Sequence, residues 1–119
     1  MSDGTRLVLA VLGGGLGAGL RVLVNLRVPP AFHPWHTLGV NALGSLVLGL
    51  VAGWAAPRSG WAALLGAGVC GGFTTFSAFS LETLTLLEEG RPGRAAAYVL
   101  GSVAAGLAGA WLGLRLSRA

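Results

Sequence analysis

Residues 71–82 combine polar and aromatic side chains inside an otherwise apolar stretch of the chain. The segment reads GGFTTFSAFSLE, so two glycines, two threonines, two serines, three phenylalanines and one carboxylate fall within twelve positions. In a membrane protein, polar groups and helix-weakening glycines are tolerated only where they face protein or a water-filled path. The segment is therefore the first candidate for a functional site.

The aromatic residues of this segment suit an anion. Phe76 and Phe79 are three positions apart, which places them on one face of a helix. The edge of an aromatic ring is positively polarised, so two ring edges can stabilise an anion without the tight binding of a full charge. Glu82 is a carboxylate within the same span and is a functional candidate for that reason. Hydroxyl donors lie nearby, at Ser77, Ser80 and Thr83.

Polar residues in the other apolar stretches can extend such a path. Asn41 can donate amide hydrogens to a partly dehydrated anion, or it can bond a neighbouring helix. Thr37 lies one turn earlier on the same face, and Tyr98 and Ser102 are one turn apart near the C-terminus. Arg21 either extends its side chain toward the membrane interface or places a positive charge at the mouth of a path.

Residues 71–75 also predict a break in their helix. Broken helices near the middle of a membrane leave backbone groups unpaired, and these groups can hold ions. If two subunits lie antiparallel, the break meets its symmetry mate. Carbonyl oxygens of both copies can then surround a small cation.

The composition places these residues in a lipid bilayer. Of the 119 residues, 54% are hydrophobic and only 10% are charged, and the mean hydropathy is +0.75. About 25% of a soluble domain is charged. The net charge of +4 comes from arginines at the ends of apolar runs, and this scatter argues against a nucleic-acid partner. The single cysteine, Cys70, excludes an intrachain disulfide.

Four stretches are long enough to span a membrane, since a spanning helix needs about 20 mostly apolar residues. The sequence predicts an all-α membrane protein with one four-helix transmembrane domain over residues 1–119. The expected spans are about 5–25, 35–54, 61–87 and 94–116. The third span contains the polar segment and is expected to be broken near the midplane. Small residues spaced four apart are expected to pack the helices closely, as at Gly13 and Gly17.

The arginines favour neither orientation in the membrane. With four spans, one side holds four arginines and the other three, with a fourth near it. The first set is Arg6, Arg58, Arg115 and Arg118, and the second is Arg27, Arg91, Arg94 and Arg21. Without a positive-inside bias the chain can insert both ways. Four short helices scarcely enclose a path alone, so we infer a homodimer, for which antiparallel subunits are one arrangement.

Residues 71–82 resemble the signature of the CrcB/Fluc fluoride channel family. The resemblance covers most of the chain. Residues 13–18 (GGGLGA) followed by Arg21 are similar to the family's first helix, and residues 37–41 (TLGVN) to the start of its second. Ala78 departs from the pattern, in which a threonine is usual.

The resemblance implies a fluoride-selective channel in the inner cell membrane that passively exports fluoride from the cytoplasm and prevents its toxic accumulation. It implies a dual-topology antiparallel homodimer with two pores, and a vestibule at Arg21. It also implies a structural sodium ion on the backbone carbonyls of Gly71 and Thr74, with no organic cofactor. The fluoride pathway would comprise Phe76, Phe79, Asn41, Ser77, Thr37, Glu82, Tyr98 and Ser102.

The main alternative is a proton-coupled exporter of the small multidrug-resistance or guanidinium type, which has a similar length and number of helices. Its mechanism needs a carboxylate in the first membrane helix. No acidic residue lies between Asp3 and Glu82, which counts against that mechanism. A membrane assembly subunit without transport activity would leave the phenylalanines, the asparagine and the glycines unexplained.

Overall fold

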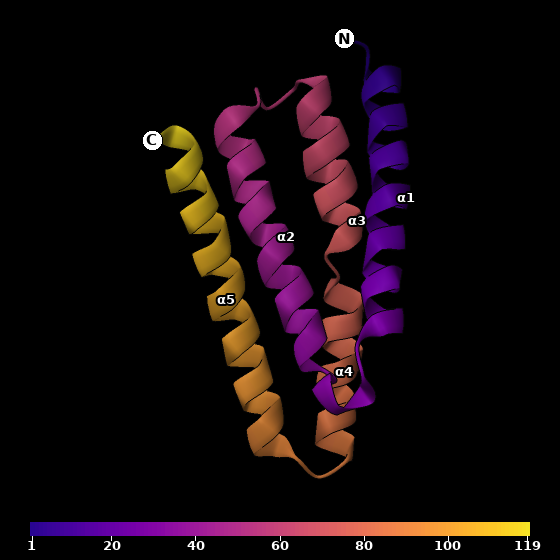
Figure 1. The fold of residues 1–119 in the computed structure, drawn as a ribbon, viewed down its shortest axis with the longest axis vertical. Helices are drawn as coiled ribbons and strands as arrows, with labels where there is room; N and C mark the ends of the chain where they lie inside the picture. Colours follow the sequence, from indigo (N-terminus) through magenta and orange to yellow (C-terminus); the bar gives the residue numbers. More distant parts are fainter.

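The computed structural model describes residues 1–119 and contains only helices, which are connected by short turns (Figure 1). Their bounds are α1 Asp3–Arg27, η1 Pro30–Phe32, α2 Trp35–Trp54, η2 Ala62–Cys70, α3 Gly71–Phe73, α4 Phe76–Glu88 and α5 Pro92–Arg118. The segments η2, α3 and α4 follow one another and form the third span, which is interrupted after α3. Four helices are long and apolar enough to cross a membrane: Asp3–Arg27, Trp35–Trp54, Ala62–Glu88 and Pro92–Arg118.

The four spans run side by side along the long axis of a molecule that measures 51 × 29 × 22 Å. Both termini and the connection between α2 and η2 lie at one end, drawn at the top of Figure 1. The connection from α1 to α2 and the turn from α4 to α5 lie at the other end. Successive spans therefore alternate in direction. α1 packs along η2 and α3, while α2 packs along α5.

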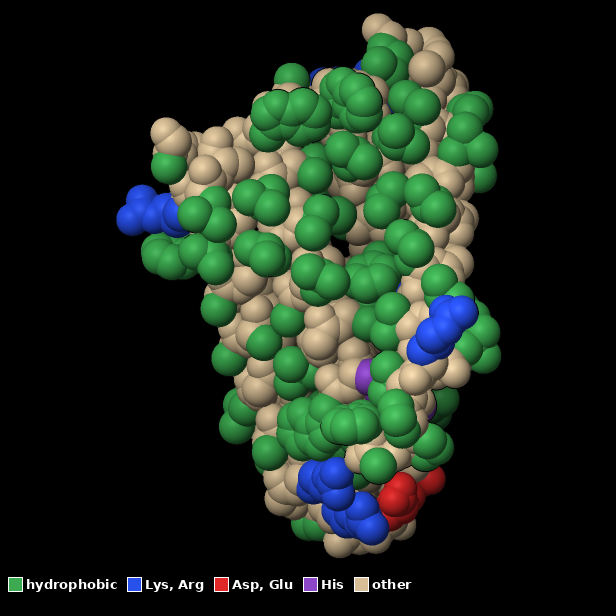
Figure 2. All heavy atoms as spheres, in the orientation of Figure 1, with side chains coloured by type: hydrophobic (Ala, Val, Ile, Leu, Met, Phe, Trp, Pro, Cys, Tyr) green, Lys and Arg blue, Asp and Glu red, His purple; other side chains and the backbone are tan.

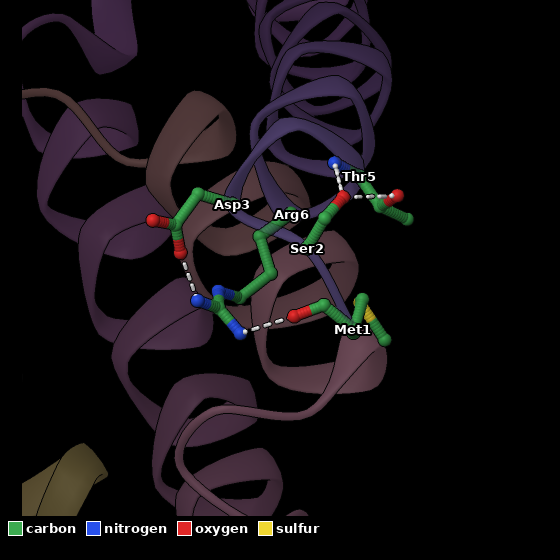
Figure 3. A network of polar contacts seen from close by, with 5 residues as sticks. All are labelled: Met1, Ser2, Asp3, Thr5 and Arg6. Atoms are coloured by element: carbon green, nitrogen blue, oxygen red, sulfur yellow. Dashed lines mark hydrogen bonds and ion pairs between the residues drawn. The ribbon is translucent and has the colours of Figure 1, made fainter.

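The N-terminus of α1 is stabilised by polar contacts among the first six residues of the chain (Figure 3). Ser2 caps the helix, since its hydroxyl oxygen accepts from the Thr5 N–H at 3.1 Å. Asp3 pairs with Arg6, and the Arg6 guanidinium also donates to the Met1 carbonyl at 3.2 Å. The Asp3 side chain is 91% exposed, so the only acid of the first span lies outside the apolar part of the helix.

The turn between α4 and α5 depends on one glycine. Gly90 has φ +74°, a left-handed conformation that other residues rarely adopt. Pro92 then starts α5, a position where its missing N–H costs no hydrogen bond. Acidic and basic side chains gather at this end of the molecule (Figure 2). The turn is therefore polar, unlike the spans that it joins.

The surface along the spans is apolar. Only 15 of 119 residues are buried, and large side chains such as Leu7 and Leu107 are 66% and 69% exposed. Hydrophobic side chains cover most of the face seen in Figure 2. Such a surface suits lipid or another protein, because in water it would be an aggregation liability.

Glycines bring the backbones of neighbouring spans into contact. A Cβ atom at Gly13 or Gly17 would overlap a carbonyl oxygen of η2, and one at Gly72 would overlap the Gly14 carbonyl of α1. The contact between α2 and α5 is built in the same way at Gly49 and Gly113. Close approach of this kind confirms the packing role expected for the small residues.

Candidate functional site

The third span is interrupted at Thr74 and Thr75, whose backbones are extended rather than helical. Thr74 has φ −82° and ψ 156°, and Thr75 has φ −147° and ψ 117°. The expected break is therefore present, but it lies after the glycine pair. Gly71 itself is helical, with φ −62° and ψ −39°. Gly72 is needed for close contact with α1, and the two threonines rather than the glycines carry the break.

Asn41 of α2 holds the break open through both halves of its amide. Its Oδ1 accepts from the Thr75 N–H at 2.7 Å, and its Nδ2 donates to the Thr75 carbonyl at 3.0 Å. Of the two roles open to Asn41 from the sequence, bonding a neighbouring helix is the one that the structure contains. One Nδ2 hydrogen remains, because an amide nitrogen has two.

Thr75 also caps α4. Its hydroxyl oxygen accepts from the Ala78 N–H at 3.1 Å, as the side chain of an N-cap residue does. Two backbone donors at the break are therefore satisfied by side chains, those of Asn41 and Thr75. At Ala78, the position of the usual threonine, the backbone N–H takes part in this cap although the side chain has no hydroxyl.

Two of the carbonyl groups at the break lose their helical donors to these side-chain bonds. In an α-helix the N–H of residue i donates to the carbonyl of residue i−4. The donor for the Gly71 carbonyl would be Thr75, which donates to Asn41 instead. The donor for the Thr74 carbonyl would be Ala78, which donates to the Thr75 hydroxyl instead. Both carbonyls are the ones expected to bind a cation.

These two oxygens fit a small hard cation in chemical type, since backbone carbonyls can replace its hydration shell. Gly71 is exposed on the surface of the single chain, so its carbonyl is within reach of a second copy. No group of three or more His, Cys, Asp or Glu side chains is arranged for a metal ion.

Arg21 lies at the same break, on the side of α1. Its Nε donates to the Gly72 carbonyl at 3.2 Å. Gly72 is in the last turn of α3, where the carbonyl ends of the helix carry a partial negative charge that a cation stabilises. Arg21 is thus fixed to the third span. The structure contains one chain and no membrane, so the vestibule expected at Arg21 stays a prediction.

A groove of 460 Å³ opens beside the break, between α2, α4 and α5. We call it the aromatic groove. Its lining includes Asn41, Ser45, Thr74, Phe76, Phe79 and Ser102. Four of the eight expected pathway residues therefore share one groove, although they come from three different spans.

Two phenylalanine rings and an unpaired hydroxyl border the aromatic groove. The rings of Phe76 and Phe79 are 5.8 Å apart and tilted by 47°. Phe76 is 79% exposed, so this chain leaves most of its side chain uncovered. The Ser102 hydroxyl is buried and has no hydrogen-bond partner. Unsatisfied buried polar groups are rare, and one that borders a groove is explained by water or a ligand.

Three further pathway residues form a hydrogen-bonded cluster next to the groove. Thr37 donates to Glu82 Oε1 at 2.8 Å, and the Tyr98 hydroxyl donates to Glu82 Oε2 at 3.1 Å. Thr37 and Tyr98 are buried, with 3% and 0% exposure. Tyr98 also packs against Phe79, with ring centroids 5.4 Å apart, and this contact joins the cluster to the aromatic groove.

The remaining hydroxyls mostly bond their own backbone. Ser80 donates to the Phe76 carbonyl at 3.0 Å and Thr83 to the Phe79 carbonyl at 2.8 Å. Ser77 is exposed, and its hydroxyl lies 3.2 Å from that of Thr75. Ser77 does not line the aromatic groove of the single chain. Its place in a fluoride pathway stays a prediction.

Sequence reasoning missed three residues of this region. Thr75 caps α4, and Gly44 lies so close to the Thr74 methyl group that a Cβ atom there would overlap it. His36 has its Nε2 3.4 Å from the Thr37 hydroxyl, and its ring lies 3.8 Å from that of His33. Thr75 could have been found as a hydroxyl residue directly before the resumed helix, which is an N-cap signal.

Comparison with known proteins identifies close relatives. A family model described as "CrcB-like protein, Camphor Resistance (CrcB)" matches residues 8–114. The chain is 47% identical to the "Fluoride-specific ion channel FluC" of Novosphingobium aromaticivorans, over 96% of this chain and 97% of that protein. Proteins of the same name from Rhodopseudomonas palustris and Methylobacterium nodulans are each 48% identical, over 94% and 93% of this chain and 96% and 94% of their own lengths.

Proposed function

The chain belongs to the family of CrcB-like proteins, and we propose that it is a fluoride-selective ion channel. It is a multi-pass membrane protein and not an enzyme. The observation that carries the proposal is the aromatic groove. It combines two phenylalanine rings, an amide and a free hydroxyl from three spans, in a chain nearly half identical to named fluoride channels.

The groups in the aromatic groove match the chemistry of fluoride. This ion is small and strongly hydrated, so a pathway must replace water with other donors. The spare Nδ2 hydrogen of Asn41, the Ser102 hydroxyl and the ring edges of Phe76 and Phe79 supply them. None carries a full positive charge, which would bind the ion too tightly for conduction.

Glu82 is compatible with an anion pathway because its carboxylate is occupied by hydrogen bonds within the protein. Both of its oxygens accept hydrogen bonds, from Thr37 and Tyr98. The hydrogen-bonded carboxylate fixes the orientation of these two hydroxyls. Because Tyr98 is in direct contact with Phe79, it also helps to position the Phe79 ring in the groove. We assign Glu82 a structural role in the pathway.

The functional unit is an antiparallel, dual-topology homodimer with two pores. Three features support it: the aromatic groove is open along one side, Phe76 is largely uncovered, and Gly71 is exposed at the break. A second copy would cover each of them. The balance of arginines between the two sides permits both insertions.

A structural sodium ion would lie where the two breaks meet. The Gly71 and Thr74 carbonyls would hold it, since both have lost their helical donors. The ion would offset the electrostatic repulsion between carbonyl oxygens that face each other. It takes no part in conduction, and no organic cofactor is needed.

Transport is passive, and the site is the inner cell membrane. An inside-negative potential drives an anion outward with about 2.3 kcal/mol per charge per 100 mV. Fluoride that accumulates in the cytoplasm therefore leaves without a coupled ion. The alternative of a proton-coupled exporter is not supported, because the only acid of α1 is the exposed Asp3 at its start.

Fluoride efflux from liposomes that contain the purified protein tests this function. We expect efflux that needs no pH gradient and excludes chloride. Phe76→Ile removes one ring edge and should slow efflux roughly tenfold, which corresponds to about 1.4 kcal/mol, near the upper end of the range for ring interactions. Phe32→Ile is the control, since Phe32 is exposed in η1, far from the groove lining. Proton-coupled cation exchange without fluoride efflux would rule the channel out.

A further inference from the structure

At the break in the third span, two side chains bind two of the backbone donors. Asn41 binds the Thr75 N–H, and the Thr75 hydroxyl binds the Ala78 N–H. Each of these N–H groups has a natural acceptor four residues earlier, which is Gly71 for the first and Thr74 for the second. The two side chains therefore compete with the two carbonyls for the same donors.

We propose that Asn41 and Thr75 are positioning residues for the cation site, because they keep the Gly71 and Thr74 carbonyls free of helical hydrogen bonds. This inference rests on the sodium site proposed above. Without the two side chains, the donors can return to the carbonyls and the third span can close into a continuous helix. A carbonyl that accepts a helical bond points along the helix axis and is no longer directed to a shared ion.

The inference connects two sites that otherwise have separate roles. Asn41 lines the aromatic groove and has one spare Nδ2 hydrogen. Its Oδ1 and its other Nδ2 hydrogen bind the Thr75 backbone at the break. The anion pathway and the cation site thus share one side chain. The cation site should respond to changes at Asn41 that do not touch either carbonyl.

A matched pair at Thr75 separates the hydroxyl from the shape of the side chain. Valine has the shape of threonine without its hydroxyl, and serine keeps the hydroxyl without the methyl group. Thr75→Val should therefore lose the cap to Ala78 without strain, and Thr75→Ser should keep it.

A second pair at Asn41 separates the acceptor from the donor. Asn41→Asp keeps an oxygen for the Thr75 N–H, loses the donor to the Thr75 carbonyl, and adds a negative charge to the aromatic groove. Asn41→Leu loses acceptor and donor together. Asn41→Asp should keep the response to sodium while fluoride efflux falls, whereas Asn41→Leu should lose both.

The measurement is the melting temperature of the purified full-length protein in sodium chloride and in N-methylglucamine chloride. We expect the wild type to melt about 5 °C higher in sodium, because an ion that binds only the native state stabilises it. Thr75→Ser should keep this difference, and Thr75→Val and Asn41→Leu should reduce it to about 1 °C or less. Binding of radioactive sodium to the same samples should follow the same order.

The possible outcomes separate the inference from its premise. Equal melting of the wild type in both salts, with no bound sodium, would remove the sodium site and the inference with it. A sodium response that Thr75→Val and Asn41→Leu retain in full would overturn the inference and leave the sodium site in place. If Asn41→Leu fails to fold, the Thr75 pair still decides, since it changes only one hydroxyl.

Discussion

The third span meets α1 and α2 in opposite ways. Towards α1 it packs backbone against backbone, because glycines such as Gly17 have no Cβ atom to separate the helices. Towards α2 the contact is made by a side chain, since Asn41 binds both backbone groups of Thr75. Glycines without side chains thus let the third span approach α1 closely. On the α2 side, the Asn41 amide binds the backbone of the third span where its helix is open. The contact with α1 packs the helices tightly, and the contact with α2 places polar groups at the candidate site.

The largest expected effect breaks the packing side. Gly17→Ala places a methyl group where the Val69 carbonyl oxygen lies, with the Phe73 N–H close by at 2.7 Å. Backbone atoms cannot move aside as a flexible side chain can, so we expect a loss of about 3 kcal/mol in the free energy of unfolding. Titration with a denaturing detergent and the yield of monodisperse protein both measure it.

Gly15→Ala is the matched control on the same helix. A Cβ atom at Gly15 meets nothing within 4 Å in the single chain. Alanine is also the better helix former, by about 1 kcal/mol. Equal losses for Gly15→Ala and Gly17→Ala would contradict the proposed difference between these glycines and would point to a partner that covers Gly15.

An intermediate effect is expected in the polar cluster that flanks the aromatic groove. Tyr98→Phe removes the donor to Glu82 Oε2 and keeps the ring that packs on Phe79. A buried hydrogen bond to a charged group is worth about 2 kcal/mol, so the unfolding free energy should fall by that amount. Trp111→Phe, at an exposed position on α5, is the control. An unchanged stability of Tyr98→Phe would show that Glu82 finds another donor.

Local sequence patterns predicted the spans, the presence of a break and the packing glycines, because each depends on residues close together along the chain. The partner of Asn41 could not be predicted in this way. Thr75 is 34 positions away, and which of many hydroxyl and amide groups it meets depends on how α2 packs against the third span. The same holds for the pairing of Thr37 with Glu82, 45 positions apart.

The exact position of the break could not be predicted from the sequence either. The prediction covered residues 71–75 and did not distinguish the glycine pair from the threonines that follow it. In the structure both glycines stay helical, with Gly72 in close contact with α1, and the threonines next to Asn41 leave the helix. No pattern indicated that the first part of the span, η2, is a π-helix.

The smallest expected effect distinguishes two serines that look alike in the sequence. The Ser102 hydroxyl has no partner and borders the aromatic groove, whereas the Ser80 hydroxyl donates to its own helix. Ser102→Ala should slow fluoride efflux about fivefold, the value of one neutral hydrogen bond of about 1 kcal/mol. Ser80→Ala should leave efflux within about twofold. A larger loss of efflux for Ser80→Ala than for Ser102→Ala would contradict this assignment, because it would place the pathway on the face of α4 that carries Ser80.

The central claim is that this chain forms a passive pathway selective for fluoride. The reversal potential of the purified protein in a planar bilayer tests it most directly, with a fluoride gradient across the membrane and equal chloride on both sides. The claim predicts a reversal potential that moves by about 59 mV for each tenfold change in the fluoride gradient, the value for a single charge. It should not move with a pH gradient. A reversal potential that stays at zero, or one that follows the pH gradient, would contradict the claim.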